Sequence, residues 1–577
     1  MTETFIRGKD AALETTLERL HQALVDLGYH IEEARWLNPA PHIWSVHIRD
    51  RDCPQVFSNG KGTTREAALA SAYGEVLERL STRYLWADFY LTPVLEEFGH
   101  VQQPEERWYP ADGAWPEELL DTATRRRYLL DGELSLAELA DLNGGDSGRG
   151  VCALPYVRQR DGRTVYFPVN LIGNLFVSNG MSAGNTRAEA QVQGLSEIFE
   201  RAVKERIISE AISLPEVPAE VLARYPDIVE GMAALSEHGF HLRALDASLG
   251  GRYPVTCIVL QHPEDGGAYA CFGAHPCFEV ALERTLTELV QGRALDELAG
   301  FPPPTADQEL VSDPHNLELH FIDASGHVSW ALLSDSPDIP FADWDDSRSN
   351  EAQRDALIDL LHAQGHDVYI AEHTALGAYA CRILVPGFSD IYPADELKWH
   401  NNNQALPVRH ILFGLKDAGE DGWRRLLEVL DTENVNDQMA ALEWAGIAPD
   451  ADTRWERLRL GELKMWLLLA LGEQGAAFDQ LEMVRASGDM SDTEQSELAA
   501  LHAVLELILA GVDLDDYRRA LVAFHGVENV AWAEACVRRE LHFPGLGVMD
   551  PACPTQAHGA LLEGYRKVLR GQARAAS

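Results

Sequence analysis

The pattern of hydrophobic and polar positions changes along the chain and divides it into two parts. Up to about residue 410, segments in which apolar and polar residues alternate, as in β-strands, are interspersed with segments of helical period. From about residue 417 onward the period is helical, and no convincing strand pattern occurs. The sequence therefore predicts an α+β (mixed α/β) domain followed by an all-α domain.

In the first part, the pattern predicts a helix over residues 10–27 and a hairpin around residues 44–56. The further strands that it predicts are 151–158, 164–177, 255–261, 269–272, 367–371 and 379–385. Between residues 92 and 150, several prolines and the Asn143-Gly144-Gly145 segment indicate a loop-rich elaboration.

In the second part, amphipathic runs separated by Gly, Asp and Asn turns predict a small stack of helices. These runs are residues 423–430, 454–471, 476–485, 494–509, 517–525 and 557–569. Their length and their Leu and Ala content suggest a tetratricopeptide-like arrangement that makes a dimer or binds a partner, although no 34-residue period is evident. The predicted division is an N-terminal part over 1–57, a core over 58–410 and a helical domain over 417–577, with the change of texture at 401–404.

One motif occurs twice in the first part and a third time in a looser form. A Gly-rich turn follows a predicted strand and leads into a helix whose polar residues are spaced at i, i+4 and i+7, positions that share one helix face. The three copies are Ser71-x3-Glu75-x2-Glu78-Arg79, Gln193-x3-Glu197-x2-Glu200-Arg201 and Arg284-x3-Glu288-x2-Gln291. Two such helices facing each other could hold four or five carboxylates around hard cations.

A polar face on a single amphipathic helix is most often only solvated. A solvated face, however, gives no reason for the same residue types to recur at the same spacing after the same kind of turn. Oxygen ligands favour Mg²⁺, Ca²⁺ or Mn²⁺ over zinc, and the Arg79, Arg201 and Arg284 guanidinium groups suit phosphate oxygens. The repeated motif therefore predicts a nucleotide–Mg²⁺ site, although no Walker-type or kinase motif is present.

Composition excludes several other classes of function. A net charge of −43 disfavours binding to the phosphate backbone of nucleic acids. The eight cysteines include no C-x-x-C pair, which disfavours a zinc ribbon or a thioredoxin-like site. The N-terminus lacks the pattern of a secretory signal, and the longest apolar run, residues 466–471, is too short for a membrane span. We therefore expect a cytoplasmic protein that binds neither nucleic acid nor membrane.

The sequence resembles the YcaO family over essentially its whole length. The resemblance rests on these motifs, on the second Gly-rich turn at 178–185, on the start of the chain at 5–14 and on the segment 390–394. The resemblance implies an ATP-binding fold in which glutamates from facing helices hold Mg²⁺ against the triphosphate. The metal-binding positions that it implies are Glu75, Glu78, Glu197, Glu200 and Glu288. The nucleotide contacts that it implies are Lys9, Ser71, Arg79, Ser182, Asn185, Gln193, Arg201 and Arg284.

The resemblance also implies a function. Family members activate a peptide backbone amide by phosphorylating its oxygen, and a close match within the family implies an accessory factor for β-methylthiolation of a small-subunit ribosomal protein. The chain ends at residues 570–577 without the Pro-rich tail of azoline-forming members, which favours the accessory role. The implied partners are a protein substrate or a methylthiotransferase, with a homodimer through the helical domain.

Two other hypotheses stay open at this point. The chain could be a non-catalytic, nucleotide-gated adaptor whose helical domain recruits a modifying enzyme. Alternatively, the same carboxylates could serve a metal-dependent hydrolase that uses no nucleotide.

Overall fold

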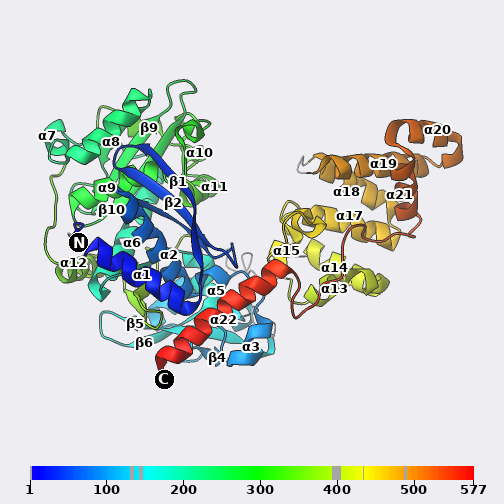
Figure 1. Ribbon diagram of the computed structural model, residues 1–577, viewed down its shortest axis with the longest axis horizontal. Helices are drawn as coiled ribbons and strands as arrows, with labels where there is room; N and C mark the ends of the chain where they lie inside the picture. Colours follow the sequence, from blue (N-terminus) through cyan, green and yellow to red (C-terminus); the bar gives the residue numbers. More distant parts are fainter. Residues whose placement is uncertain are drawn as a thin grey trace.

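The computed structural model describes residues 3–129, 135–141, 147–392, 405–432, 435–486 and 490–576. The chain forms a larger lobe of three antiparallel sheets with their helices, and a smaller lobe that is all helical (Figure 1). The predicted fold class is thus confirmed. Three features of the sequence lie outside the described residues: the turn at 143–145, the end of the 390–394 segment and the change of texture at 401–404.

The first sheet contains the predicted hairpin and one strand that the alternating pattern did not single out. That strand, β1 (Ile31–Ala40), pairs with β2 (Ile43–Asp50), which pairs with β3 (Phe57–Gly62). The predicted first helix is α1 (Leu13–Leu27), and it packs against α2 (Arg65–Thr82), the helix that follows β3.

The second sheet has six strands in the order β4-β5-β11-β12-β7, with β6 paired to β5. Their bounds are Arg107–Tyr109 for β4, Val151–Arg158 for β5, Thr164–Pro168 for β6, Met181–Gly184 for β7, Tyr369–His373 for β11 and Tyr379–Leu384 for β12. The predicted strand over 164–177 is therefore wrong beyond Pro168, where α5 (Val169–Leu171) and a π-helix, η5 (Ile172–Phe176), follow. An unbroken apolar run does not distinguish a strand from a buried helix, and only packing decides.

The third sheet has the order β10-β9-β8 and faces a long helix that it shares with the second sheet. Its strands are β8 (His241–Asp246), β9 (Val255–Gln261) and β10 (Ala268–Ala274). The shared helix is α6 (Arg187–Ser209), which follows β7, contacts both sheets and lies within one hydrophobic core with them. Helix α9 (Phe278–Leu289) follows β10 and packs against both the third and the first sheet.

The larger lobe also carries shorter helices around these layers. The loop-rich stretch contains α3 (Thr92–Phe98) and α4 (Thr122–Tyr128) in addition to β4. The other described α-helices of this lobe are α7 (Ala219–Leu222), α8 (Pro226–Glu237), α10 (Gln308–Val311), α11 (Pro314–Ile322) and α12 (Asn350–Ala363). No described helix has the length and apolarity needed to cross a bilayer.

The smaller lobe contains the predicted helices together with three that the pattern did not single out, α13, α15 and α21, and its core includes many Leu, Ala and Trp side chains. Its helices are α13 (Arg409–Phe413), α14 (Gly419–Thr432), α15 (Ala441–Trp444), α16 (Arg454–Arg457), α17 (Leu460–Leu471), α18 (Gln474–Ala486), α19 (Asp492–Leu509), α20 (Leu514–His525) and α21 (Val527–Val537). The predicted helix over 454–471 is interrupted because the backbone of Leu458 and Leu460 exchanges hydrogen bonds with Met439 and Ala441. The tetratricopeptide-like character stays a prediction.

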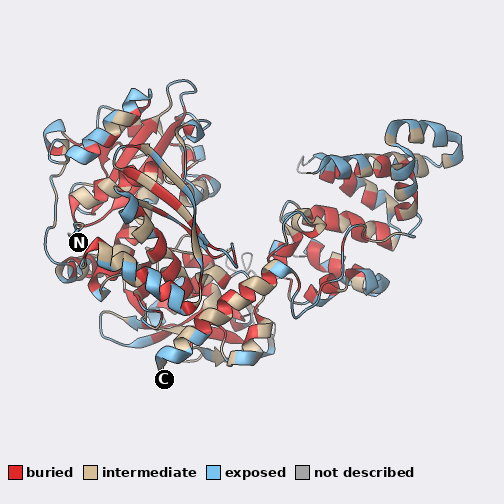
Figure 2. Cartoon of the chain, viewed as in Figure 1, coloured by how far each residue is buried: buried red, intermediate tan, exposed pale blue. Residues whose placement is uncertain are grey.

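The last helix, α22 (Gln556–Ala576), leaves the smaller lobe and returns to the larger one (Figure 1). It packs on α1 and α3, and buried residues occur along its length (Figure 2). Its Leu562 and Tyr565 are fully buried in the same core as Leu24 and Trp86. The end of the chain is therefore part of the core of the larger lobe. The division of the sequence into three domains stays a prediction.

Candidate nucleotide and metal site

The three copies of the repeated motif share one local structure: a glycine in the strand lies directly against the helix that follows. A Cβ at Gly60 would lie 2.0 Å from the carbonyl oxygen of Ala68 in α2, and a Cβ at Gly184 would lie 2.8 Å from the backbone nitrogen of Ala190 in α6. Gly273 has the same relation to α9, where a Cβ would lie 2.7 Å from the Ala281 carbonyl oxygen. Each glycine permits the close packing of strand and helix that sets the direction of the polar face.

The first two copies also begin their helices in the same way. The hydroxyl group of Thr64 accepts a hydrogen bond from the Ala67 backbone N–H at the start of α2, and Thr186 accepts one from Glu189 at the start of α6. Such caps satisfy backbone donors that a helix leaves unpaired at its N-terminus. The N-cap residue of α9, Cys277, makes no such hydrogen bond, and the Asp345 carboxylate accepts from the Phe278 backbone N–H instead, in keeping with the looser third copy of the motif.

The polar faces of α2, α6 and α9 meet at one cavity of about 470 Å³, over which the N-terminal segment at residues 6–11 also lies. The predicted metal-binding residues that line it are Glu75, Glu78, Glu197, Glu200 and Glu288. The predicted nucleotide-binding residues that line it are Lys9, Ser71, Arg79, Asn185, Gln193, Arg201 and Arg284. The tertiary structure thus brings together residues that the sequence separates by more than 270 positions.

Ser182 is the one predicted residue that does not line this cavity. Its side chain is fully buried, and its hydroxyl group lies 3.2 Å from the Cys381 sulfur on the neighbouring strand. Side chains alternate across a strand, so a residue of β7 that faces the packed interior cannot also face the cavity. Ser178 lines the cavity instead, from the start of the same Gly-rich turn.

Each polar face holds one glutamate in an ion pair. Arg79 pairs with Glu75 across one turn of α2 at 2.5 Å, and Arg201 pairs with Glu197 across one turn of α6 at 2.8 Å. In α9, Glu288 pairs with the ammonium group of Lys61, which comes from β3. The same residue types therefore make the same contact in the first two copies, and the third copy takes its cation from another element.

Glu78 has no such partner within the described parts of the chain, and its carboxyl group has a shifted pKa. Its surroundings in the protein raise its pKa to about 8, chiefly through burial, and the charges of Glu197 and Glu75 add to this against the opposing charge of Arg79. A carboxyl group that lies among carboxylates is ionised readily only when a cation is close. This electrostatic environment is the one that a divalent cation would relieve.

A hydrogen-bonded group that sequence reasoning missed orients Asn185. The side-chain oxygen of Asn185 accepts hydrogen bonds from Thr16 and Arg19, and its amide donates to Glu189 at 3.0 Å. Glu189 is almost fully buried and also pairs with Lys9 at 3.3 Å. The recurrence of helical spacing gave no indication of Arg19 or Glu189, because both depend on contacts between α1 and α6.

Lys61 and His275 also line the cavity. Lys61 lies within the first predicted Gly-rich turn, which the structure shows to be strand β3 up to Gly62, so its position in the motif was the available indication. Burial lowers the pKa of its ammonium group to about 8. His275 is buried with a pKa lowered to about 3, and its Nδ1 accepts a hydrogen bond from the Cys277 backbone N–H, as expected of a neutral residue in a turn.

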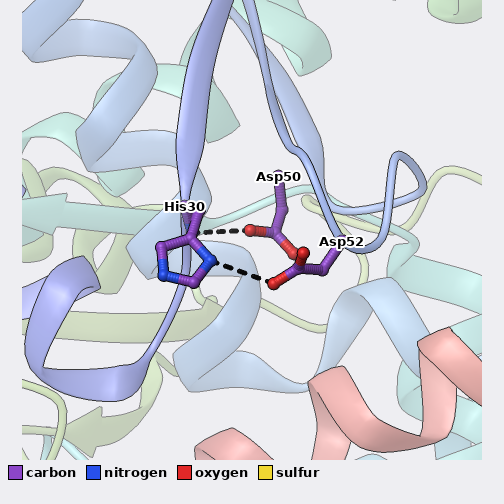
Figure 3. Close-up of side chains that lie close together, drawn as sticks. All are labelled: His30, Asp50 and Asp52. Atoms are coloured by element: carbon purple, nitrogen blue, oxygen red, sulfur yellow. Dashed lines mark hydrogen bonds and ion pairs between the residues drawn. The ribbon is translucent and has the colours of Figure 1, made fainter.

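A second group of potential metal ligands lies outside this cavity. Among the described residues, three His, Cys, Asp or Glu ligand atoms come within 4.8 Å of one another only at His30, Asp50 and Asp52 (Figure 3). Asp50 already accepts hydrogen bonds from the backbone N–H groups of His30 and Cys53, and the Lys567 ammonium group of α22 lies 3.5 Å from Asp52. The Lys567 ammonium group therefore already balances the charge of these carboxylates, and the ion pair links α22 to the first sheet.

The residues that line the large cavity fit a nucleotide with Mg²⁺. Its volume lies in the range of small-molecule sites, and carboxylate oxygens are ligands that Mg²⁺ accepts. The buried Nε atoms of Arg284 and Arg19 have no hydrogen-bond partner among the described residues, as expected of donors that await an acceptor. The ion pairs at Glu75, Glu197 and Glu288 must rearrange for these carboxylates to share a cation.

Comparison with known proteins agrees with this arrangement. A family model described as "YcaO cyclodehydratase, ATP-ad Mg2+-binding" matches residues 59–389, and one described as "YcaO cyclodehydratase C-terminal domain" matches residues 405–575. The chain is 48% identical to the Escherichia coli protein named "Ribosomal protein S12 methylthiotransferase accessory factor YcaO", over 99% of both chains. It is 47% identical to an uncharacterised protein of Haemophilus influenzae, again over 99% of both.

Two solved structures are more distant. The YcaO protein of Methanopyrus kandleri bound with AMPPCP and Mg²⁺ is 19% identical, with 67% of this chain and 95% of that chain covered and a TM-score of 0.41. A heterocyclase in complex with substrate and cofactor is 17% identical, with 67% of this chain and 54% of that chain covered and a TM-score of 0.41.

Proposed function

Because the chain belongs to the YcaO family, we propose that it consumes ATP with Mg²⁺ in support of methylthiolation of ribosomal protein S12. ATP and Mg²⁺ are the ligands of the family domain that covers residues 59–389. The role as accessory factor is the one named for the relative from E. coli, with which this chain shares nearly its full length. The alternative within the same chemistry is that the chain itself activates a backbone amide of its protein substrate.

The cavity at which α2, α6 and α9 meet carries this proposal. Glu75, Glu78, Glu197, Glu200 and Glu288 would hold Mg²⁺, and the cation when bound offsets negative charge on the phosphate oxygens. Arg79, Arg201 and Arg284 offer guanidinium donors to the phosphate oxygens. Lys9, in the N-terminal segment, forms an ion pair with Glu189 and contributes a further positive charge to the cavity.

The chain's own residues would act mainly by position. Transfer of a phosphoryl group needs its reactants held in line and the developing charge neutralised, and it needs no protein nucleophile. Gln193 accepts a hydrogen bond from Arg284 at 2.5 Å, which fixes the direction of that guanidinium group between α6 and α9. Thr16 and Arg19 fix Asn185 in the same way from α1.

The partners that we propose are a methylthiotransferase or its protein substrate, together with a second copy of the chain through the smaller lobe. A cytoplasmic location remains a prediction from the sequence.

The proposal is tested by incubating the purified chain with ATP and Mg²⁺ and resolving ADP, AMP, phosphate and pyrophosphate. We expect turnover in the wild type and its loss in Glu197→Ala, whereas Glu66→Ala, at an exposed glutamate in the first turn of α2, should retain it. The nucleotide product identifies the phosphate bond that is broken. Turnover that persists in Glu197→Ala would refute the site, and metal-dependent hydrolysis without ATP would favour the hydrolase.

The adaptor hypothesis is favoured by the word "accessory" in the name of the E. coli relative. It predicts tight ATP binding without turnover even when the partner is present. Deleting everything beyond residue 415 would not test it cleanly, because α22 belongs to the core of the larger lobe. Replacing the exposed Phe524 and Val527 of the smaller lobe by Ser tests recruitment and leaves that core intact.

A further inference from the structure

A second, smaller cavity of about 40 Å³ lies one helical turn beyond Glu78, at the C-terminal end of α2. Thr82, whose hydroxyl group donates to the Glu78 carbonyl oxygen at 2.9 Å, lines it together with Arg83. Arg382 of β12 and Gly173 of the π-helix η5 also line it. This cavity belongs to none of the interactions described above.

Three residues that line this cavity each have a buried hydrogen-bond donor atom without an acceptor among the described residues. The atoms are Nη2 of Arg83, Nε2 of Gln102 and Nε of Arg382, and none has a hydrogen-bond partner among the described residues. The three residues are 1%, 4% and 6% exposed, respectively. An unpaired buried donor costs about 1–3 kcal/mol, and more when it is charged, so three of them at one small cavity call for a common acceptor.

The two guanidinium groups also lack a counter-ion. Neither Arg83 nor Arg382 has a described carboxylate within ion-pair distance, and both donate to backbone carbonyl oxygens instead. Burial of these cations lowers the pKa of both residues. Glu78, which offsets part of the charge of Arg382, would be engaged by Mg²⁺ in the loaded cavity. The described residues that line the cavity therefore include two buried cations and no carboxylate.

The backbone around the cavity is held in uncommon conformations. Arg83 has a φ of +64° and Val177, whose carbonyl oxygen accepts from Arg382, has a φ of +48°. The intervening wall is a π-helix, a feature that occurs frequently at functional sites. Left-handed conformations of residues other than glycine persist only where their surroundings fix them, and they cluster at ligand-binding positions.

We infer that this cavity binds a monoanion of the size of a carboxylate group. The space exceeds the roughly 10–15 Å³ that one water molecule needs, so it admits a group of a few heavy atoms. A carboxylate has three, carries one charge and offers only acceptors, which matches three donors and two positive charges. The anion is either free in solution or part of an acidic side chain that enters from another protein.

The test is thermal unfolding of the chain in chloride-free buffer at constant sodium concentration. Sodium formate is added in place of the sodium salt of HEPES. The sulfonate anion of HEPES is too bulky to enter the cavity. We expect a saturable rise in Tm of about 2 °C or more in the wild type, because a ligand that binds only the folded state stabilises it. Arg382→Met should abolish the saturable part. A wild-type Tm that does not respond to formate would overturn the inference.

A second variant keeps the test decisive if Arg382→Met does not fold. A Cβ at Gly173 meets no atom within 4 Å, so Gly173→Asp can place a carboxylate at the cavity and Gly173→Asn the matched neutral group. Gly173→Asp should lose the response to formate, which Gly173→Asn should keep. Equal formate responses in both variants would contradict the inference.

A third arm identifies the source of the anion. N-acetyl-aspartate amide carries the same carboxylate on a peptide-like frame, and N-acetyl-asparagine amide is its neutral counterpart. Stabilisation by the aspartate compound and not by the asparagine compound assigns the cavity to an acidic side chain. Stabilisation by formate alone assigns it to a free anion. None of these measurements includes ATP, so their outcome is independent of the proposed function.

Discussion

Two enclosed glutamates, one in each lobe, show opposite electrostatics. Glu494, at the start of α19, accepts hydrogen bonds from the Ser491 hydroxyl group and backbone N–H and forms ion pairs with Arg454 and Arg457. Burial alone would raise its pKa, but these partners lower it to about 2. Glu78 lies in the large cavity, where burial and two neighbouring carboxylates raise its pKa to about 8.

The difference teaches how the two lobes use charge. In the smaller lobe, the chain itself supplies every partner of the buried carboxylate, so the charge contributes to the stability of the fold. In the cavity, too little positive charge surrounds the Glu78 carboxyl group to keep it ionised. A bound cation would supply the missing positive charge. Perturbed groups of this second kind are typical of functional sites.

The largest expected effect is at Glu78. Glu78→Gln removes a proposed metal ligand and should lower ATP consumption by roughly 10²–10³-fold, the range seen when one electrostatic contact to a transition state is lost. Without Mg²⁺, the free energy of unfolding should stay unchanged or rise, because an ionised carboxylate is disfavoured there. ATP consumption and urea unfolding measure the two effects, with Glu66→Gln as control.

Glu494→Gln should have the reverse outcome. Removing the charge leaves the partly exposed Arg457 without its carboxylate and the buried Arg454 with Glu462 alone among the described carboxylates, and the smaller lobe should lose on the order of 3 kcal/mol of stability at pH 7. Hydrogen exchange in α17 and α19 should accelerate by roughly 10²-fold if the lobe opens locally. ATP consumption should persist. The exposed Glu506 on the same helix provides the control, Glu506→Gln. Equal losses of stability in Glu78→Gln and Glu494→Gln would remove the contrast between the lobes.

The smallest expected effect concerns His558, where the two lobes meet. Its Nδ1 accepts from the Ala448 backbone N–H and its Nε2 donates to the Tyr90 carbonyl oxygen, an arrangement that requires the neutral ring. Burial lowers the pKa of His558 from 6.5 to about 4. The unfolded chain therefore binds a proton at a higher pH than the folded chain does, and stability that is complete above pH 6.5 is lost as the pH falls toward 4.

At pH 5 this loss should amount to about 2 kcal/mol relative to pH 7. Urea unfolding at pH 7, 6 and 5 measures it in the wild type and in His558→Gln, whose amide can make both hydrogen bonds without titrating between these pH values. The variant should lose that part of the pH dependence. A variant with the wild-type pH profile would assign the acid sensitivity to other groups.

The fold class and most elements follow from the sequence because hydrophobic periodicity reports which face of an element is buried. Strand β9 and the helices α14, α18, α19 and α20 of the smaller lobe appear where the pattern places them, whereas α21 lies in none of the predicted runs. Prediction was wrong over residues 169–176, where a continuous apolar run leaves the period undefined, and at Leu458, where backbone hydrogen bonds to a distant segment break a helix. Neither cause can be read from local sequence.

For the site, the repetition of Glu, Arg and Gly at fixed spacing was enough to select the polar faces of α2, α6 and α9. It did not reveal Lys61 as the partner of Glu288, nor the network of Thr16, Arg19 and Glu189 around Asn185, because these contacts join elements far apart in the chain. Ser182 was placed at the cavity on resemblance, and the alternation of side chains along β7 turns it inward.

The sequence by itself determined the two-part organisation, the three strand–glycine–helix units and the residue types that each unit presents. The tertiary structure decided which of those residues meet, that α22 closes the core of the larger lobe, and that Arg83, Gln102 and Arg382, each with an unpaired buried donor, line one small cavity. The reason is physical. Periodicity and local hydrogen bonding act over one or two turns of the chain, whereas burial and charge compensation depend on every element that packs around a group.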